Sequence, residues 1–197
     1  MMTDSKDHLR DERREQIKRA ALKVFAQRGL IGTKMNMIAR EAQISDGLSY
    51  RYFKSKEEIL TELIKEAIEG SNEAFALITN MPGSPIEKVR TLTNEILQED
   101  NHHFILMQQV MLADELPHEV AELLKTHDSA AMINTLTAII AKGQHSGEFV
   151  EGNPKELAMW YLTSLVGLMN IQKIDIEGYQ LPDADFMMRL IVKPNPI

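Results

Sequence analysis

Residues 44–60 read ISDGLSYRYFKSKEEIL, and this stretch decides the fold. Ser45 is a good cap for a short helix that ends near Tyr52, because a serine hydroxyl accepts a hydrogen bond from a free amide of the first turn. Ser55 and Glu58 form a capping box, which marks the start of another helix. The stretch therefore predicts a short helix, a tight connection and then a long helix.

The residues before this stretch predict two more helices. Apolar side chains recur at helical spacing over residues 8–28, and Gly29 supplies a natural C-terminal stop. A second, short helix is expected to begin near Thr33–Met35 and to run through Ala42. Three short helices, the last two joined by a tight turn, have the layout of a helix-turn-helix unit, whose reading helix enters the major groove of DNA.

The remainder of the chain also reads as helix, with no convincing strand of period two. The long helix is expected to run from 56 to about 78, and the stretch MPGSP at 81–85 breaks it. Further helices are predicted at about 86–98, 101–114, 117–143, 154–172 and 182–192. The fold class is therefore all-α.

Composition narrows the classes of function. The 197 residues carry a net charge of −7, but the first third is basic and the rest is acidic, so only one end is expected to meet a polyanion. The absence of cysteine excludes disulfides and thiol chemistry. The N-terminus lacks the apolar segment of a signal peptide and no apolar run is long enough to span a membrane, which predicts a cytoplasmic protein without a membrane partner.

No enzyme is expected, because no catalytic residues, nucleophile–base set or phosphate loop can be placed. The histidines at 102, 103 and 127 match no defined metal spacing, so neither a metal nor a cofactor is expected. The alternative to a DNA-binding protein is a helical adaptor or membrane-surface module without sequence-specific DNA binding. Acidic side chains in the basic first helix disfavour an anionic surface; they are Asp11, Glu12 and Glu15.

Residues 14–62 resemble the DNA-binding domain of the tetracycline-repressor (TetR) family. The matching positions are Ala20, Ala21, Phe25, Gly29, Ile38, Ala39, Ala42, Ser45, Gly47, Tyr50, Arg51, Tyr52, Phe53, Lys56, Glu57 and Leu60. The resemblance implies a helix-turn-helix DNA-binding domain over 1–55 and a helical ligand-binding and dimerisation domain over 56–197. It also implies a homodimeric transcriptional regulator, a repressor released from a palindromic operator by a small-molecule effector.

Within the reading region, eight residues are candidates for contact with double-stranded DNA: Lys34, Asn36, Asp46, Gly47, Leu48, Tyr50, Tyr52 and Lys56. The tyrosines and Lys56 suit phosphate oxygens, whereas Asp46 and Leu48 suit a cytosine amine and a thymine methyl group. Two alternatives to DNA contact remain open. The tyrosines could instead pack in a small core, and Asp46 could instead compensate the dipole at the start of its helix. The chain has Leu48-Ser49 where the family often has Thr-Leu, and Lys34 where the family often has a capping threonine. Either Thr33 takes over that cap or Lys34 points at a phosphate. Both departures leave the fold intact and concern the base preference.

Two further sets of residues are assigned to the helical body. The segment 154–172 is apolar nearly all round, which predicts burial on both sides and a four-helix dimer interface shared with 182–192. The interface candidates are Leu165, Val166, Met169, Phe186, Met187 and Leu190. Methionine is abundant, with 12 residues, and suits either a core or an adaptable pocket for an apolar effector. The pocket candidates are Phe104, Met107, Met111, His127, Ala131 and Trp160.

Overall fold

The computed structural model describes residues 2–97, 102–128, 130–171, 177–178 and 180–194, with side chains from His8 onward. Every described element is helical apart from one isolated bridge between Phe149 and Val192, so the all-α prediction is confirmed. The chain forms two compact units. Residues 2–69 and 102–127 make the head unit, and the described residues of 70–97 and 128–194 make the body unit. Of the described helices, none is long and apolar enough to cross a membrane.

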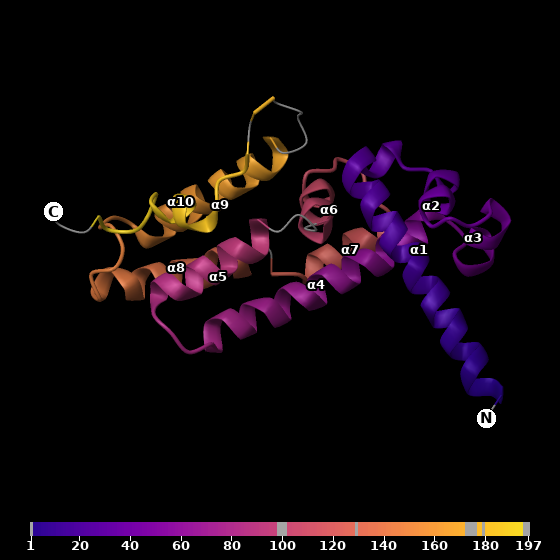
Figure 1. The fold of residues 1–197 in the computed structure, drawn as a ribbon, viewed down its shortest axis with the longest axis horizontal. Coiled ribbons are helices and arrows are strands. Elements are labelled where there is room, and N and C mark those ends of the chain that lie inside the picture. The colour runs from indigo at the N-terminus through magenta and orange to yellow at the C-terminus, as the bar shows by residue number, and fades with distance from the viewer. Residues whose placement is uncertain (1, 98–101, 129, 172–176, 179, 195–197) are drawn as a thin grey trace. The chain divides into compact units, whose positions relative to one another are not determined.

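The head unit is built around its first helix (Figure 1). Its elements are α1 (Met2–Gly32), α2 (Met35–Glu41), α3 (Asp46–Tyr52), the first part of α4 (Lys56–Asn80), α6 (His102–Met111) and α7 (His118–Thr126). Helix α1 packs on α2 and α6, and α2 packs on α3. The core joins apolar side chains from α1, α2, α4, α6 and α7 with Phe53, which follows α3. Among the others are Ile17, Phe25, Ile38, Ile64, Leu106 and Val120.

The expected helix ends are mostly present. Gly29 has φ 74°, a left-handed conformation that interrupts α1. The Ser45 hydroxyl accepts from the Leu48 amide at 3.3 Å, which confirms the cap of α3. Of the two alternatives at the start of α2, the cap by Thr33 is not formed, because the Thr33 hydroxyl donates back to the carbonyl of Gly29 at 2.8 Å and leaves Lys34 as a cap residue without a side-chain bond. A phosphate contact by Lys34 stays a prediction.

The body unit packs α5 (Pro85–Leu97) against three other helices (Figure 1). These are α8 (Ala131–His145), α9 (Pro154–Ile171) and α10 (Ala184–Met188), and α8 also packs on α9. The buried Tyr161 hydroxyl shares a hydrogen bond of 2.7 Å with Thr93, which satisfies both polar groups inside the core. Burial raises the pKa of the Tyr161 phenol, and the hydrogen bond to Thr93 opposes that rise.

Two predicted helices differ from the structure. The segment 117–143 is not one helix, because α7 ends at Thr126 and α8 begins at Ala131, with Asp128 accepting from the amide of Ala130 in the connection. The segment 182–192 holds only α10, after which the chain turns and the amide of Val150 donates to the carbonyl of Ile191. A local hydrogen bond in the first place, and a bond to a distant segment in the second, replace the helical pattern that apolar spacing suggested.

The compact units are not divided at residue 55, and the functional domains expected over 1–55 and 56–197 stay a prediction. Helices α6 and α7 belong to the head unit although they follow α5 in the chain. Leu106 is fully buried in the head core, and the Gln109 side chain donates to the carbonyl of Ala26 in α1 at 3.1 Å. Contacts far apart in sequence therefore assign these two helices to the head.

Replacing Gly143 with alanine is expected to destabilise the body unit by about 2 kcal/mol, despite the higher helix propensity of alanine. A β-carbon at Gly143 in α8 would lie 2.2 Å from the ring of Phe149, which is 1% exposed and has little room to move. Urea unfolding followed by circular dichroism measures the loss. Gly167→Ala in α9 is the matched control, because an added β-carbon there meets no atom within 4 Å. An equal effect in both variants would contradict the packing argument.

Candidate DNA-binding surface

A sharp turn between α2 and α3 sets the direction of the reading helix. The amide of Ala42 donates to the carbonyl of Ile38 at 2.8 Å, and the amide of Ile44 donates to that of Ala39 at 2.9 Å. Gln43 between them has φ 55°, which is uncommon for a residue with a side chain. The surrounding bonds hold this conformation, so α3 leaves the turn in a fixed orientation.

The eight DNA-contact candidates lie on or beside the outer side of this unit. Lys34, Asn36, Asp46, Gly47 and Tyr50 are exposed, while Leu48, Tyr52 and Lys56 are half-buried. Tyr50 is 55% exposed, so its ring is available to a partner rather than used in the core. Ser49 is fully buried and donates to the carbonyl of Asp46 at 2.7 Å. Of the two positions at which the chain departs from the usual Thr-Leu of the family, DNA can therefore reach only the side chain of Leu48.

Three basic side chains extend the surface beyond those candidates. Arg51 lies in the last turn of α3, Lys54 in the connection to α4, and Arg40 in the last turn of α2, and all three are exposed. The direction in which Arg40 and Arg51 point depends on the turn between α2 and α3. The spacing of residues in the sequence therefore did not identify them as DNA contacts. Their positive charge favours a phosphate backbone.

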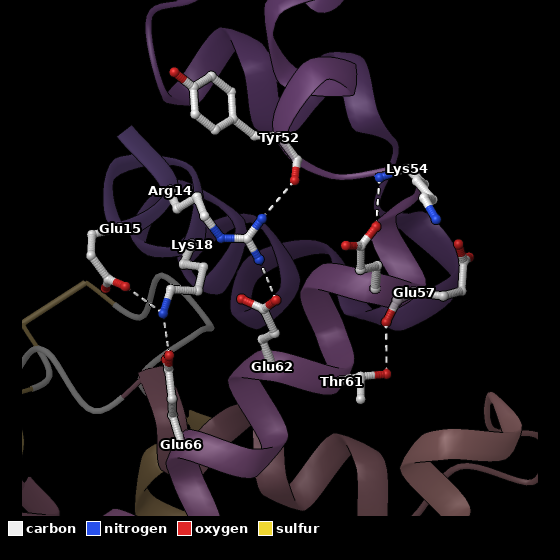
Figure 2. A network of polar contacts seen from close by, with 10 residues as sticks. Arg14, Glu15, Lys18, Tyr52, Lys54, Glu57, Thr61, Glu62 and Glu66 are labelled. Atoms are coloured by element: carbon white, nitrogen blue, oxygen red, sulfur yellow. Dashed lines mark hydrogen bonds and ion pairs between the residues drawn. The ribbon is translucent and has the colours of Figure 1, made fainter. Parts of the chain in front are cut away.

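Side chains of α1 bond to the C-terminal ends of α2 and α3, the two helices that we call the reading unit. The Gln16 amide donates to the carbonyl of Ala42 at 2.7 Å, and the Arg14 guanidinium donates to the carbonyl of Tyr52 at 2.7 Å. Both carbonyls stand at helix C-termini, where backbone acceptors lack helical partners. Figure 2 shows Arg14 between the end of α3 and α4.

Two ion pairs join α1 to α4 (Figure 2). Arg14 pairs with Glu62, and Lys18, four residues further along α1, pairs with Glu66, four residues further along α4. Burial acts to lower the pKa of the Lys18 ammonium, but hydrogen bonds to Glu15 and Glu66 outweigh it and leave that pKa above its ordinary value. Lys18 thus stays charged and paired, and the two pairs fix α1 against the first turns of α4.

Lys56 has internal partners that its sequence position did not reveal. Its ammonium donates to the carbonyls of Leu30 at 2.8 Å and Thr33 at 2.9 Å, so it closes the segment between α1 and α2. An ammonium has three donors, which leaves one for a phosphate. A phosphate contact by Lys56 stays a prediction beside this structural role.

Lys56→Ala is therefore expected to act twice. Loss of two charge-assisted hydrogen bonds should lower the free energy of unfolding by about 1–3 kcal/mol. If Lys56 also binds a phosphate, the slope of log affinity against log salt should fall by about one unit. Urea unfolding and DNA titration at several salt concentrations separate the two roles, and an unchanged slope would remove Lys56 from the phosphate contacts.

The sequence that contains the reading unit matches a known protein family. Residues 17–63 match the family described as bacterial regulatory proteins, tetR family. Over 172 residues the chain is 30% identical to the fatty acid metabolism regulator protein of Bacillus subtilis, an alignment that covers 82% of this chain and 86% of that protein. The chain belongs to the TetR family. The assignment makes the protein a DNA-binding transcriptional regulator, and contact with DNA through the surface of α2 and α3 stays a prediction.

Solved structures of TetR-like proteins share the whole architecture. A putative fatty acid metabolism regulator of Clostridium perfringens is 25% identical, with a TM-score of 0.61 over 89% of this chain and 96% of that one. The ketosteroid regulator KstR2 of Mycobacterium tuberculosis is 20% identical, with a TM-score of 0.68 over 92% and 96% of the two chains, which shows the shared fold.

The pocket candidates of this TetR-family chain fall in both units. Phe104, Met107 and Met111 lie on α6, and His127 follows α7, all in the head unit. Ala131 and Trp160 belong to the body unit, where Trp160 is 65% exposed on α9. Met107 packs against the head core, whereas Met111 is exposed. Effector binding by these six residues stays a prediction.

The dimer-interface candidates divide into two groups. Leu165, Met169 and Met187 are buried within the chain itself, so they pack the body unit rather than form its surface. Phe186 and Leu190 are exposed and Val166 is half-buried, so these three remain candidates for contact with a second copy. The predicted interface therefore mixed residues from two sides of α9. Leu165 and Met169 lie on the side that packs inside the chain, and Val166 is partly exposed.

Proposed function

We propose that this TetR-family protein is a homodimeric repressor that controls genes of fatty acid metabolism and leaves its operator when it binds a fatty acyl compound. The observation that carries the proposal is the similarity to the Bacillus subtilis fatty acid metabolism regulator across most of both chains. Similarity of this length includes the body as well as the head. The Clostridium perfringens structure, described as a putative fatty acid metabolism regulator, also supports a role in fatty acid metabolism.

The head supplies the features that operator binding needs. Helix α3 is capped at its start and tied to α1 at its end, and it carries exposed Asp46, Gly47 and Tyr50. Base-edge readers set within basic and phenolic phosphate contacts suit a major-groove reader. One short reading helix gives little specificity, so two copies on a palindromic operator fit the proposal better than one.

The body supplies exposed apolar side chains for contact with a second copy. Trp160 on α9 and Phe186 and Leu190 at α10 are all exposed in the single chain. Large exposed apolar side chains are characteristic of interaction surfaces, and aromatic residues often dominate their energetics. We infer that these side chains together form the surface at which two copies meet across a twofold axis.

Selection of bound sequences from a random DNA pool tests the DNA-binding part of the proposal. The expected product is a palindrome whose half-site centres are about 34–36 Å apart, so that two reading helices enter successive major grooves. A pool without enrichment would contradict operator binding, and an enriched sequence without twofold symmetry would contradict the dimer.

Effector release is tested with acyl probes of different length. Palmitic acid and palmitoyl-coenzyme A are expected to release the selected duplex, whereas acetate and acetyl-coenzyme A are not, because apolar chain burial drives binding. Release requires coupling of about 1–3 kcal/mol, and the duplex must weaken probe binding by the same factor. Titration of each probe with and without duplex measures the coupling, and equal affinities in both would refute it.

A further inference from the structure

We propose that Arg14 is a positioning residue for DNA binding, which sets the reading helix through the backbone of Tyr52 and ties it to α4. The proposal rests on the operator binding proposed above, and it concerns a residue on a helix that precedes the reading unit.

Helix α3 is too short to be stable alone, since isolated helices of its length do not persist in water. The helix has seven residues and packs on α2. Of its side chains, that of Ser49 is buried. The C-terminal end is followed at once by Phe53 in extended conformation and then by the start of α4. The direction of α3 therefore depends on what holds this end.

Arg14 holds that end through three partners. Its guanidinium donates to the Tyr52 carbonyl at 2.7 Å and lies 4.2 Å from the centre of the Phe53 ring. It also pairs with Glu62 in α4. A planar guanidinium with several donors can satisfy a carbonyl, a carboxylate and an aromatic face at once, which a lysine ammonium cannot. A cation is also favourable at a helix C-terminus.

The half-buried Arg14 side chain is engaged by protein partners rather than free for DNA. Its side chain is 26% exposed, and two terminal nitrogens are directed at protein acceptors. The neighbouring pair of Lys18 and Glu66 joins the same two helices without a recorded bond to α3. Lys18→Met is thus a matched control: it removes one positive charge and one α1–α4 ion pair, as Arg14→Met does, but spares the bond to Tyr52.

The first measurement is hydrogen exchange of the full-length protein without DNA. In Arg14→Met, the amides of Phe53 and Lys54 should exchange about tenfold faster, because a charge-assisted bond that holds this end is lost. Amides of α2 should keep their protection, as should those of α3 in Lys18→Met. Equal changes in α2 and α3 of Arg14→Met would mean general destabilisation and would overturn the proposal.

The second measurement compares DNA affinities. The ratio of affinity for the selected duplex to that for a random duplex of equal length should fall about tenfold in Arg14→Met and stay within about twofold in Lys18→Met. Arg14→Lys should not restore the ratio. A fall of one unit in salt slope confined to Arg14→Met would indicate a phosphate contact instead, and an unchanged ratio in folded Arg14→Met would also overturn the proposal. If wild-type protein binds no duplex selectively, operator binding fails, and the exchange measurement alone judges Arg14.

Discussion

Trp160→Glu should give a folded monomer. Trp160 is 65% exposed in the single chain, so a glutamate there is tolerated by the fold but places a charge inside the proposed apolar dimer surface. A buried unpaired charge costs several kcal/mol, enough to dissociate a dimer at micromolar concentration. Light scattering measures the mass, and circular dichroism checks the helix content. A dimer of unchanged affinity would move the interface away from this surface.

The same substitution five residues later has a different expected result. Leu165 is 0% exposed and lies in the body core, so Leu165→Glu should unfold the body unit rather than dissociate a folded dimer. A charge without a partner in an apolar core costs more than most single substitutions and takes up much of the stability of an ordinary protein. The pair of variants separates assembly from folding, which one variant cannot do. Folded Leu165→Glu monomers would contradict the described core.

Phe53→Ala should remove DNA binding by unfolding the end of the reading unit. The Phe53 ring is 1% exposed, belongs to the head core and lies under the Arg14 guanidinium. Truncation of a buried phenylalanine costs about 3–5 kcal/mol, since both burial and packing are lost. Urea unfolding at fixed protein concentration measures this cost, and gel shift with the selected duplex measures binding.

Tyr50→Ala is the control for that variant. Tyr50 is an exposed aromatic residue three positions earlier, so its truncation should change the free energy of unfolding by less than about 0.5 kcal/mol. If it binds a phosphate as expected, Tyr50→Ala weakens DNA binding in a protein of normal stability. Equal destabilisation by both variants would contradict the contrast between core and surface.

Short-range signals predicted much of the head. The caps at Ser45 and Ser55, the interruption at Gly29 and the order of helices follow from neighbouring residues, and these features are present. Glu58 was also expected to bond back toward its cap, and its carboxylate does so one residue earlier, at the amide of Lys54. Local hydrogen bonds depend on residues within a few positions, which is why sequence spacing predicts them well.

Long-range contacts explain what the sequence did not predict. Lys56 bonds to carbonyls more than twenty residues earlier, and Arg14 to one nearly forty residues later, and no periodicity encodes such partners. The two sides of α9 read alike as apolar, so Leu165 and Trp160 could be separated only after α5 and α8 were seen to cover one side. The break between α7 and α8 lacks the glycine or proline that usually marks one.

The burial of Ser49 restricts how this regulator can be given a new operator. Because that side chain is enclosed and bonded to the Asp46 carbonyl, a larger residue there would displace α3 before it touched a base. A library for redesign would instead vary Asn36, Asp46 and Leu48, and keep Ser49 and Gln43 fixed. In this chain, base preference is therefore open to change at the exposed or half-buried positions of α2 and α3, whereas a change at position 49 also requires the core beneath α3 to be repacked.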